Sequence, residues 1–272
     1  MKQAAIGSLI RTWRQRRHLS QLDLASDANI STKHLSFLET GRSQPSRDML
    51  LHLAEHLEVP LREQNVLLVA AGYAPLFSER SLDDDDLDPA REAIQHVLHG
   101  HEPYPAIAIN RHWQMIMANN CIDYFLAGVA SELLTPPVNV LRLSLHPQGL
   151  APQIVNLAAW KAHLLARLRH QIELTADGSL SELYQELAAY PTNQAHSTPI
   201  PAYHETMDIA LPFALRTPHG VLSFFSTTMV FGTPIDVTVS ELAIEAFFPA
   251  NTATAELLRQ LHAAKTSSRV SN

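Results

Sequence analysis

The chain has 272 residues, 46% hydrophobic and 17% charged, a composition that excludes a disordered or fibrous protein and suits about two globular domains. Its single cysteine, Cys121, excludes an internal disulfide framework and is typical of a reducing compartment. The chain begins without an apolar signal core and has no apolar run long enough to cross a membrane, so we expect a soluble, cytoplasmic protein.

The net charge of −7 is unevenly distributed along the chain. Up to Arg47 there are eight basic and three acidic side chains, a net charge of +5, so the remaining residues carry −12. A basic head on an acidic body is typical of a phosphate-binding module joined to a regulatory domain.

Residues 5–17 have the periodicity of an amphipathic leading helix, and residues 19–45 predict two short helices joined by a tight turn. Ser20 and Asp23 form a capping-box pattern, and Leu22, Leu24 and Ala25 give the first short helix an apolar face. Asn29 suits the left-handed turn, Ser31 caps the second helix and Gly41 ends it.

The second short helix leaves a polar face outside. Thr32, Lys33, His34, Ser36 and Phe37 point away from its apolar positions, which is the arrangement of a helix-turn-helix reader of the DNA major groove. An amphipathic helical pair without a DNA role is the alternative.

The run S-Q-x-x-L-A followed by S-x-x-x-L-S-x-L-E-x-G-x-x-x-P resembles the Cro/repressor-type (XRE) helix-turn-helix family over about a quarter of the chain. The resemblance implies that Gln21 contacts phosphate, that Arg14 and Glu39 form a buried pair, and that the base edges face four residues: Thr32, Lys33, Ser36 and Phe37. Phe37 departs from the usual polar residue and could touch thymine methyl groups. Ser31, His34 and Arg42 complete the predicted DNA-binding set, Arg42 at a phosphate position.

Two further helices, over 45–58 and 62–71, complete an all-α head of five helices at residues 1–77. His52 and His56 lie four residues apart, a spacing that can bind metal. Neither a carboxylate nor a cysteine motif supports them, so two surface histidines are the favoured interpretation and no metal site is predicted. Residues 78–88 carry Asp83–Asp86 and Asp88 and predict a solvated acidic linker.

Residues 89–265 predict an α+β body with an antiparallel sheet. The expected elements are helices at 90–99, 119–126, 152–171, 179–189 and 252–264, strands at 104–110 and 113–118, and strands at 207–217 and 220–231 that meet in a hairpin at 218–220. Residues 138–145 could be helix or strand, residues 237–248 suggest a strand that becomes a helix, and the polar tail is expected to be disordered.

This order of elements is that of a PAS-like domain, which wraps one antiparallel sheet around a ligand cavity. Three segments resemble the MmyB-like transcription regulators: the strand-turn-strand that ends at Asn119, NVLRLSLHPQGLAP (139–152), and LSFFSTTMVFGTPIDVTVSELAIEAFFPA (222–250). The resemblance covers nearly the whole chain and implies a regulator in which an XRE-type head is joined to a small-molecule sensor.

The expected cavity would be apolar with few polar groups and would suit a small apolar ligand such as a fatty acid or a similar amphiphile. Its expected lining comprises Trp113, Met115, Met117, Phe125, Trp160, Phe224, Phe225 and Phe231. Arg142 and His146 are the candidate partners for a ligand carboxylate. The alternative is that Arg142 pairs with an internal acid such as Asp123 and that the aromatic residues form ordinary core.

No nucleophile elbow, zinc-protease motif or phosphate loop is present, so we expect neither an enzyme nor a cofactor. Cys121 is interpreted as a buried, inert thiol. The predicted partners are double-stranded DNA, a small apolar ligand and a second copy of the chain, because repressors of this type read palindromic sites as dimers. Two alternatives stay open for the body: oligomerisation or protein contact without a ligand, and metal sensing through its histidines.

Overall fold

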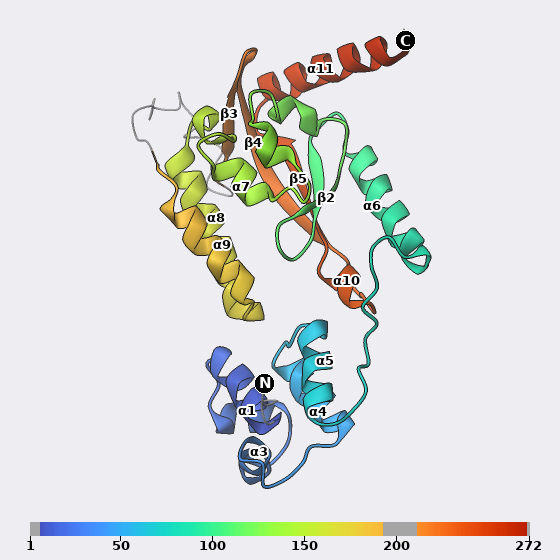
Figure 1. Cartoon of the computed structure of the whole chain (residues 1–272), viewed down its shortest axis with the longest axis vertical. Coiled ribbons are helices and arrows are strands. Elements are labelled where there is room, and N and C mark those ends of the chain that lie inside the picture. The colour runs from blue at the N-terminus through green and yellow to red at the C-terminus, as the bar shows by residue number, and fades with distance from the viewer. Residues whose placement is uncertain (1–5, 193–210, 271–272) are drawn as a thin grey trace. The chain divides into compact units, whose positions relative to one another are not determined.

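The computed structural model describes residues 6–192 and 211–270, which form two compact units (Figure 1). The first unit comprises Met1–Ser81, Gln171–Ala176 and Thr233–Ser240. The second comprises Leu82–His170, Asp177–Gly232 and Glu241–Asn272. The predicted fold class, a helical head followed by an α+β domain with an antiparallel sheet, is confirmed.

The first unit is helical. Its helices are α1 (Ile6–Arg16), α2 (Gln21–Asp27), α3 (Thr32–Glu39), α4 (Arg47–His56), α5 (Leu61–Ala70) and the short α10 (Val237–Ser240). Ser20 and Asp23 form the predicted capping box of α2, and the Ser31 hydroxyl accepts a hydrogen bond from the His34 N–H at the start of α3. Asn29 has a φ of 51°, the left-handed conformation that the predicted turn requires.

An apolar core holds α1 to α5 together, with Ile10, Leu24 and Leu35 among its most buried members. The prediction that Leu22 belongs to the apolar face of α2 is wrong, because this residue is 66% exposed. Helix α1 crosses α3 at Gly7, where a Cβ atom would lie 2.4 Å from the Leu38 carbonyl oxygen. Glycine is therefore the residue that allows this close crossing.

The second unit contains a five-stranded sheet. Its strands are β1 (Ala106–Ile109), β2 (Met115–Ala118), β3 (Phe213–Thr217), β4 (Gly220–Val230) and β5 (Ala243–Pro249), in the order β2-β1-β5-β4-β3 with every neighbouring pair antiparallel. The predicted hairpin is confirmed, since Thr217 pairs with Gly220 across the turn. Residues 207–210 of the expected third strand lie outside the described residues.

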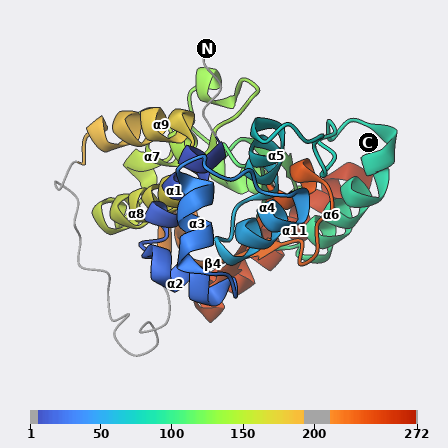
Figure 2. The same cartoon turned by 90° about the horizontal axis from the view of Figure 1, so that it is seen from below.

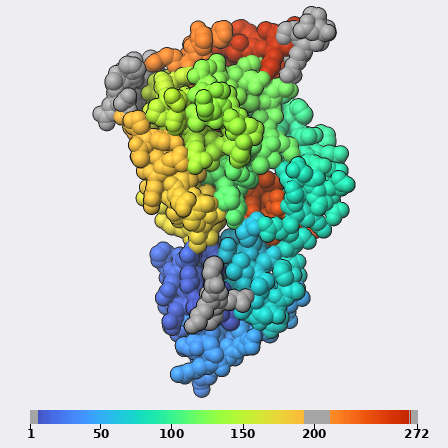
Figure 3. Space-filling view, in the orientation of Figure 1, coloured from blue at the N-terminus to red at the C-terminus, as the bar shows by residue number. Residues whose placement is uncertain are grey.

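Successive residues of a regular strand lie on opposite faces of a sheet. On one face, small residues of β1 and β5 pack with Ile94 and Leu98 of α6 (Asp88–Gly100). The opposite face meets α7 (Val140–Leu145) and α8 (Leu157–Thr175) around the pocket described below. In Figure 1 α7 lies in front of strands of the sheet, and Figure 3 shows the green and yellow-green chain, which includes α7, at the surface of the second unit.

Helix α9 (Gly178–Ala189) follows α8, and α11 (Thr252–Val270) packs against β4 and β5. Residues 138–145, for which helix and strand were both open, form α7 behind an Asn139 cap. Residues 237–248 reverse the predicted order, because α10 precedes β5. The predicted disordered tail is also wrong up to Val270, since α11 continues to that residue.

Within the segment expected to be a linker, Asp85–Leu87 form a 3-10 turn with Leu87 buried, and Asp88 begins α6. None of the helices in the two described ranges carries an apolar stretch of the length that a membrane crossing requires.

Candidate functional site

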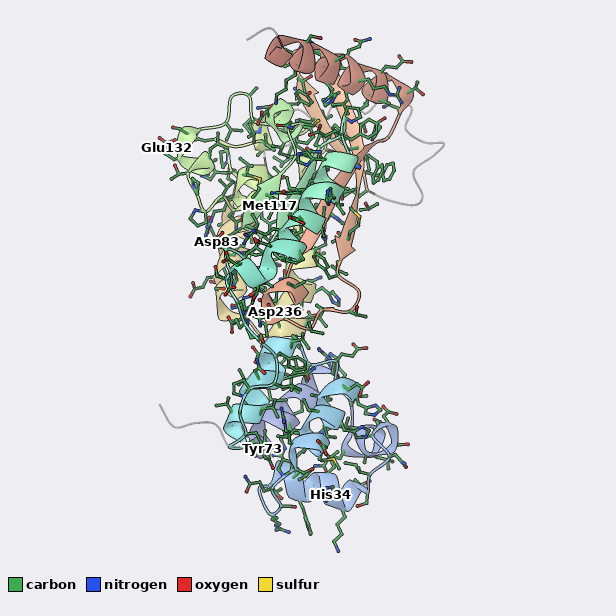
Figure 4. All side chains as sticks on the ribbon, turned by 90° about the vertical axis from the view of Figure 1, so that its right-hand side faces the viewer. His34, Tyr73, Asp83, Met117, Glu132 and Asp236 are labelled. Carbon is green, nitrogen blue, oxygen red and sulfur yellow. The ribbon has the colours of Figure 1, made fainter. Side chains whose placement is uncertain are left out.

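The first candidate site is the outward side of α3. Lys33 is exposed, whereas Thr32, His34, Ser36 and Phe37 are half-buried; Ser31 and Arg42, at either end, are exposed. Figure 2 shows α2 and α3 next to each other, and Figure 4 labels His34 on α3. All seven residues thus lie on one short helix and its two ends, where a DNA groove could reach them.

Two cations lie beside the unusual aromatic residue of this surface. The Lys33 ammonium and the Arg42 guanidinium each lie 5.7 Å from the centre of the Phe37 ring. Cation–π attraction at this distance holds both positive charges near the outward side of α3. Phe37 therefore organises the charged side chains in addition to offering an apolar contact.

The buried pair that the resemblance implied is present. Arg14 Nε donates to Glu39 Oε1 at 2.6 Å, and Arg14 Nη2 donates to Glu39 Oε2 at 3.0 Å. The Glu39 side chain is fully enclosed and also accepts from Arg11 Nε at 3.4 Å. Burial by itself raises the pKa of Glu39, but the hydrogen bonds from Arg14 and Gln21 outweigh it, and the pKa is lowered overall.

Gln21 has a partner that the sequence did not suggest. Its Nε2 donates to Glu39 Oε2 at 2.7 Å, so one amide N–H belongs to the network that ties α1, α2 and α3 together. A glutamine amide carries two N–H groups. The phosphate contact implied for Gln21 therefore stays a prediction that relies on the second one.

The second candidate site is an apolar pocket in the second unit, with an empty volume of about 670 Å³ that includes its open side. Its lining comes from the sheet, from α7, from α8 and from the segment around Phe125, and includes Ile107, Trp113, Met115, Phe125, Val140, Leu141, Leu143, Ser144, Trp160, Arg167, Phe213, Glu245 and Phe247. Most of these side chains are apolar, as in pockets that bind small molecules.

Four of the predicted lining residues are brought together here: Trp113, Met115, Phe125 and Trp160. Met117, Phe225 and Phe231 do not line the pocket. Met117 pairs with Ala108 on the α6 face of the sheet, and Phe225 stacks on Phe248 of that same face. The prediction fails for Phe225 because Phe224 and Phe225 are consecutive in a strand and face opposite sides. It fails for Met117 because the register shift between Ala108 and Ile109 places Met115 and Met117 on opposite faces.

Phe224 lies in the core, and Phe231 is a partly buried side chain packed against the core. Phe224 is fully buried behind the pocket wall, with its ring 5.2 Å from that of Phe125. Phe231 packs with the α6 cluster. For these two side chains, the alternative of ordinary core holds in the structure.

Arg142 and His146 lie away from the pocket. Arg142 Nη2 donates to Glu186 Oε2 at 2.7 Å, and its side chain is 45% exposed. His146 ends α7, with its ring 5.1 Å from that of Tyr190. Because residues 140–145 form a helix whose other positions line the pocket, Arg142 points outward and pairs with an acid, although Glu186 and not Asp123 is that acid.

The charged groups of the pocket are Arg167 and Glu245, which the sequence analysis missed. Arg167 Nη2 donates to Glu245 Oε1 at 2.5 Å and to Thr228 Oγ1 at 3.1 Å, and the Thr228 hydroxyl donates to Glu245 Oε1 at 2.8 Å. The Arg167 guanidinium also lies 4.9 Å from the centre of the Trp113 ring. A glutamate within the apolar run AIEAFFP was the available signal, since a buried carboxylate needs a partner.

Cysteine and histidine side chains elsewhere make local contacts. Cys121 is buried, its Sγ lies 3.6 Å from His262 Nδ1, and burial raises the pKa of its thiol to about 11, as for an unreactive thiol. His52 Nε2 lies 2.8 Å from the Ala28 carbonyl oxygen, and its ring meets that of His56 edge to face. Among the described residues no three His, Cys, Asp or Glu side chains form a group that could hold a metal ion.

Comparisons with known proteins found matches to residues of both units. Two curated relatives, each called an uncharacterized HTH-type transcriptional regulator, come from Mycobacterium tuberculosis strains CDC 1551 / Oshkosh and ATCC 25618 / H37Rv. Each is 40% identical over 88 residues, which cover 32% of this chain and 55% of the relative. The chain therefore spans about half the length of the curated relatives it matches.

A solved structure, that of the clp gene regulator ClgR from Corynebacterium glutamicum, is 23% identical in sequence and has a TM-score of 0.23. The match covers 38% of this chain and 96% of the ClgR chain.

A family model described as helix-turn-helix matches residues 10–64. A second family model, described as the MmyB-like transcription regulator ligand binding domain, matches residues 90–261. Since this second match covers more than half of the chain, the chain belongs to the family of MmyB-like transcription regulators.

Proposed function

We propose that the protein is a sequence-specific DNA-binding transcription regulator whose second unit binds a small apolar ligand. The observation that carries the DNA-binding half is the outward side of α3, where Lys33 and Arg42 flank Phe37 within a helix-turn-helix unit. The observation that carries the ligand-binding half is the apolar pocket with a single paired charge cluster.

In this proposal α3 enters the major groove. Thr32, Lys33, Ser36 and Phe37 face base edges, whereas Arg42 and the free N–H of Gln21 contact phosphates. Ser31 and His34 lie at the start of the helix, where they can reach the sugar-phosphate backbone. The regulator acts as a cytoplasmic homodimer on a palindromic site, with half-sites about one turn of DNA apart.

The salt dependence of DNA binding by the full chain tests this half of the proposal. A protein that neutralises phosphates with Arg and Lys releases counterions, so its affinity falls steeply with salt. We expect a linear decrease of log affinity with log salt on any duplex, and a tighter constant on a selected site. An affinity that is independent of salt would contradict the placement of Arg42 at phosphate.

The proposed ligand is a fatty acid or a similar amphiphile. Its chain would lie against Trp113, Met115, Phe125 and Trp160, and its polar end near Arg167, which replaces Arg142 as the cation of the pocket. Burial of each methylene stabilises such a complex by about 0.8 kcal/mol, so the length of the chain sets the affinity.

Native mass spectrometry of the purified full chain tests the ligand half. A bound amphiphile should appear as an added mass that organic extraction removes. A chain that carries no added mass and shows no saturable binding of straight-chain amphiphiles would favour the alternative, in which the second unit serves oligomerisation.

A further inference from the structure

The polar end of the pocket is built from three elements. Arg167 comes from α8, Glu245 from β5 and Thr228 from the position of β4 that pairs directly with Glu245. The Glu245 side chain is 6% exposed and that of Arg167 is 28% exposed. Both side chains line the pocket, so a ligand reaches an ion pair that is already formed.

The pocket has no net charge. Arg167 and Glu245 are its charged lining residues, and Ser144, whose Oγ accepts from Trp160 Nε1 at 2.9 Å, adds an uncharged hydroxyl. A further titratable group, His163, lies one turn before Arg167 on α8, with its ring stacked on that of the lining residue Trp160. Burial and then the charge of Arg167 lower the pKa of His163, which keeps that ring neutral at physiological pH.

A ligand with an ionised headgroup would give the pocket a net charge. Within the described residues, Arg167 forms its hydrogen bonds through Nη2, which leaves Nε–H and Nη1–H groups for a ligand. A carboxylate at those groups would lie close to the carboxylate of Glu245 in a poorly solvated site, and like charges repel strongly there. A hydroxyl, carbonyl or amide can accept the same hydrogen bond without adding charge.

We propose that the pocket selects amphiphiles whose polar end is uncharged, and that Glu245 is the residue that determines this specificity. This inference rests on the proposed ligand-binding function and narrows its ligand class. A ligand carboxylic acid would bind as its protonated form, with one proton taken up per molecule bound. An alcohol or an amide of the same chain length would bind without proton uptake.

The test is calorimetric titration of the full chain with two ten-carbon probes, decan-1-ol and decanoate, at about pH 8, where the carboxylate is ionised. We expect decan-1-ol to bind at least about tenfold more tightly than decanoate. The variant Glu245→Gln removes the charge and keeps the shape, so the ratio of decanoate affinity to decan-1-ol affinity should rise at least about tenfold. Glu186→Gln, at a second arginine-paired glutamate away from the pocket, is the matched control and should change neither constant.

The wild-type protein alone provides a second test if Glu245→Gln does not fold. The decanoate constant should weaken by about tenfold per pH unit between about pH 7 and pH 8, and the decan-1-ol constant should not change. Decanoate binding that equals or exceeds decan-1-ol binding, with no dependence on pH, would overturn the selection and leave the pocket as a ligand site. Binding of neither probe to the wild type or to Glu245→Gln would overturn the proposed ligand-binding function itself.

Discussion

Glu39 is enclosed by the first unit and depends on Arg14 for its charge balance. In Arg14→Ala the buried carboxylate of Glu39 would keep two partners, the amide of Gln21 and the Nε of Arg11, which lies 3.4 Å away. Breaking such a buried pair costs roughly 3–5 kcal/mol of unfolding free energy. Amide hydrogen exchange across α1 and α3 in the full chain should show this loss of protection.

Arg11→Ala is the control at the same carboxylate. Arg11 is 49% exposed and lies at 3.4 Å, so its removal should cost less than about 1 kcal/mol. Equal effects of the two substitutions would mean that the Arg14–Glu39 pair does not hold α1 to α3.

The lowered pKa of Glu39 predicts that the stability of the first unit depends on pH. Because the pKa of Glu39 is lowered in the folded protein, its stabilisation is complete above the unfolded value of about 4.3 and is lost as the pH falls through the lowered value. Exchange protection of α1 and α3 should therefore decrease below about pH 4 in the wild type. It should decrease less in Glu39→Gln, and an identical acid profile for both proteins would contradict this role of Glu39.

At the level of single residues, local pattern predicted much of the first unit and less of the second. The caps Ser20 and Ser31 are properties of short motifs, whereas the Arg14–Glu39 pair was implied by the family resemblance, and the structure confirms all three. The Arg167–Glu245 pair joins residues 78 positions apart, and no periodicity links a helix to a distant strand in that way. The packing of α8 against the sheet brings them together.

Among the elements, α7 and α9 are joined by Arg142 and Glu186, and this pair yields a prediction about the ligand. Arg142 lies on the outer side of α7, so Arg142→Ala should leave the affinity for decan-1-ol unchanged within about twofold and cost at most about 1 kcal/mol of stability, as exposed pairs do. Calorimetry and thermal unfolding measure both. A loss of decan-1-ol affinity of about tenfold or more in Arg142→Ala would mean that Arg142, and not Arg167, binds the polar end of the ligand.

The elements also show where sequence pattern was ambiguous. Residues 140–145 are apolar around one arginine, a composition that fits both a helix with one outward residue and a buried strand, and the Asn139 cap decides for the helix. In 237–248, a glutamate that pairs with Arg167 interrupts the apolar pattern, which therefore suggests a strand that becomes a helix, whereas the structure has a short helix followed by β5. Long-range pairing thus hides the local signal.

At the scale of the whole molecule, the ligand can regulate only if it changes the affinity for DNA. Thermodynamic linkage requires that the DNA site change the ligand affinity by the same factor, typically about 5- to 150-fold. Fluorescence anisotropy measures the factor by which saturating decan-1-ol changes the affinity for DNA. Calorimetry measures the factor by which saturating DNA changes the affinity for decan-1-ol, and we expect the two factors to be equal. A factor of one in both would mean that the pocket does not control DNA binding.

The most direct test of the central claim, a DNA-reading α3, is binding-site selection with the full chain. The wild type should enrich one motif. Lys33→Ala should lose roughly 1–3 kcal/mol of binding free energy at that motif and should relax the base preference at one position of it. Arg42→Ala should instead weaken all sequences alike and lower the salt slope by about one. Enrichment of no motif by the wild type, or of the same motif with undiminished preference by Lys33→Ala, would contradict the account.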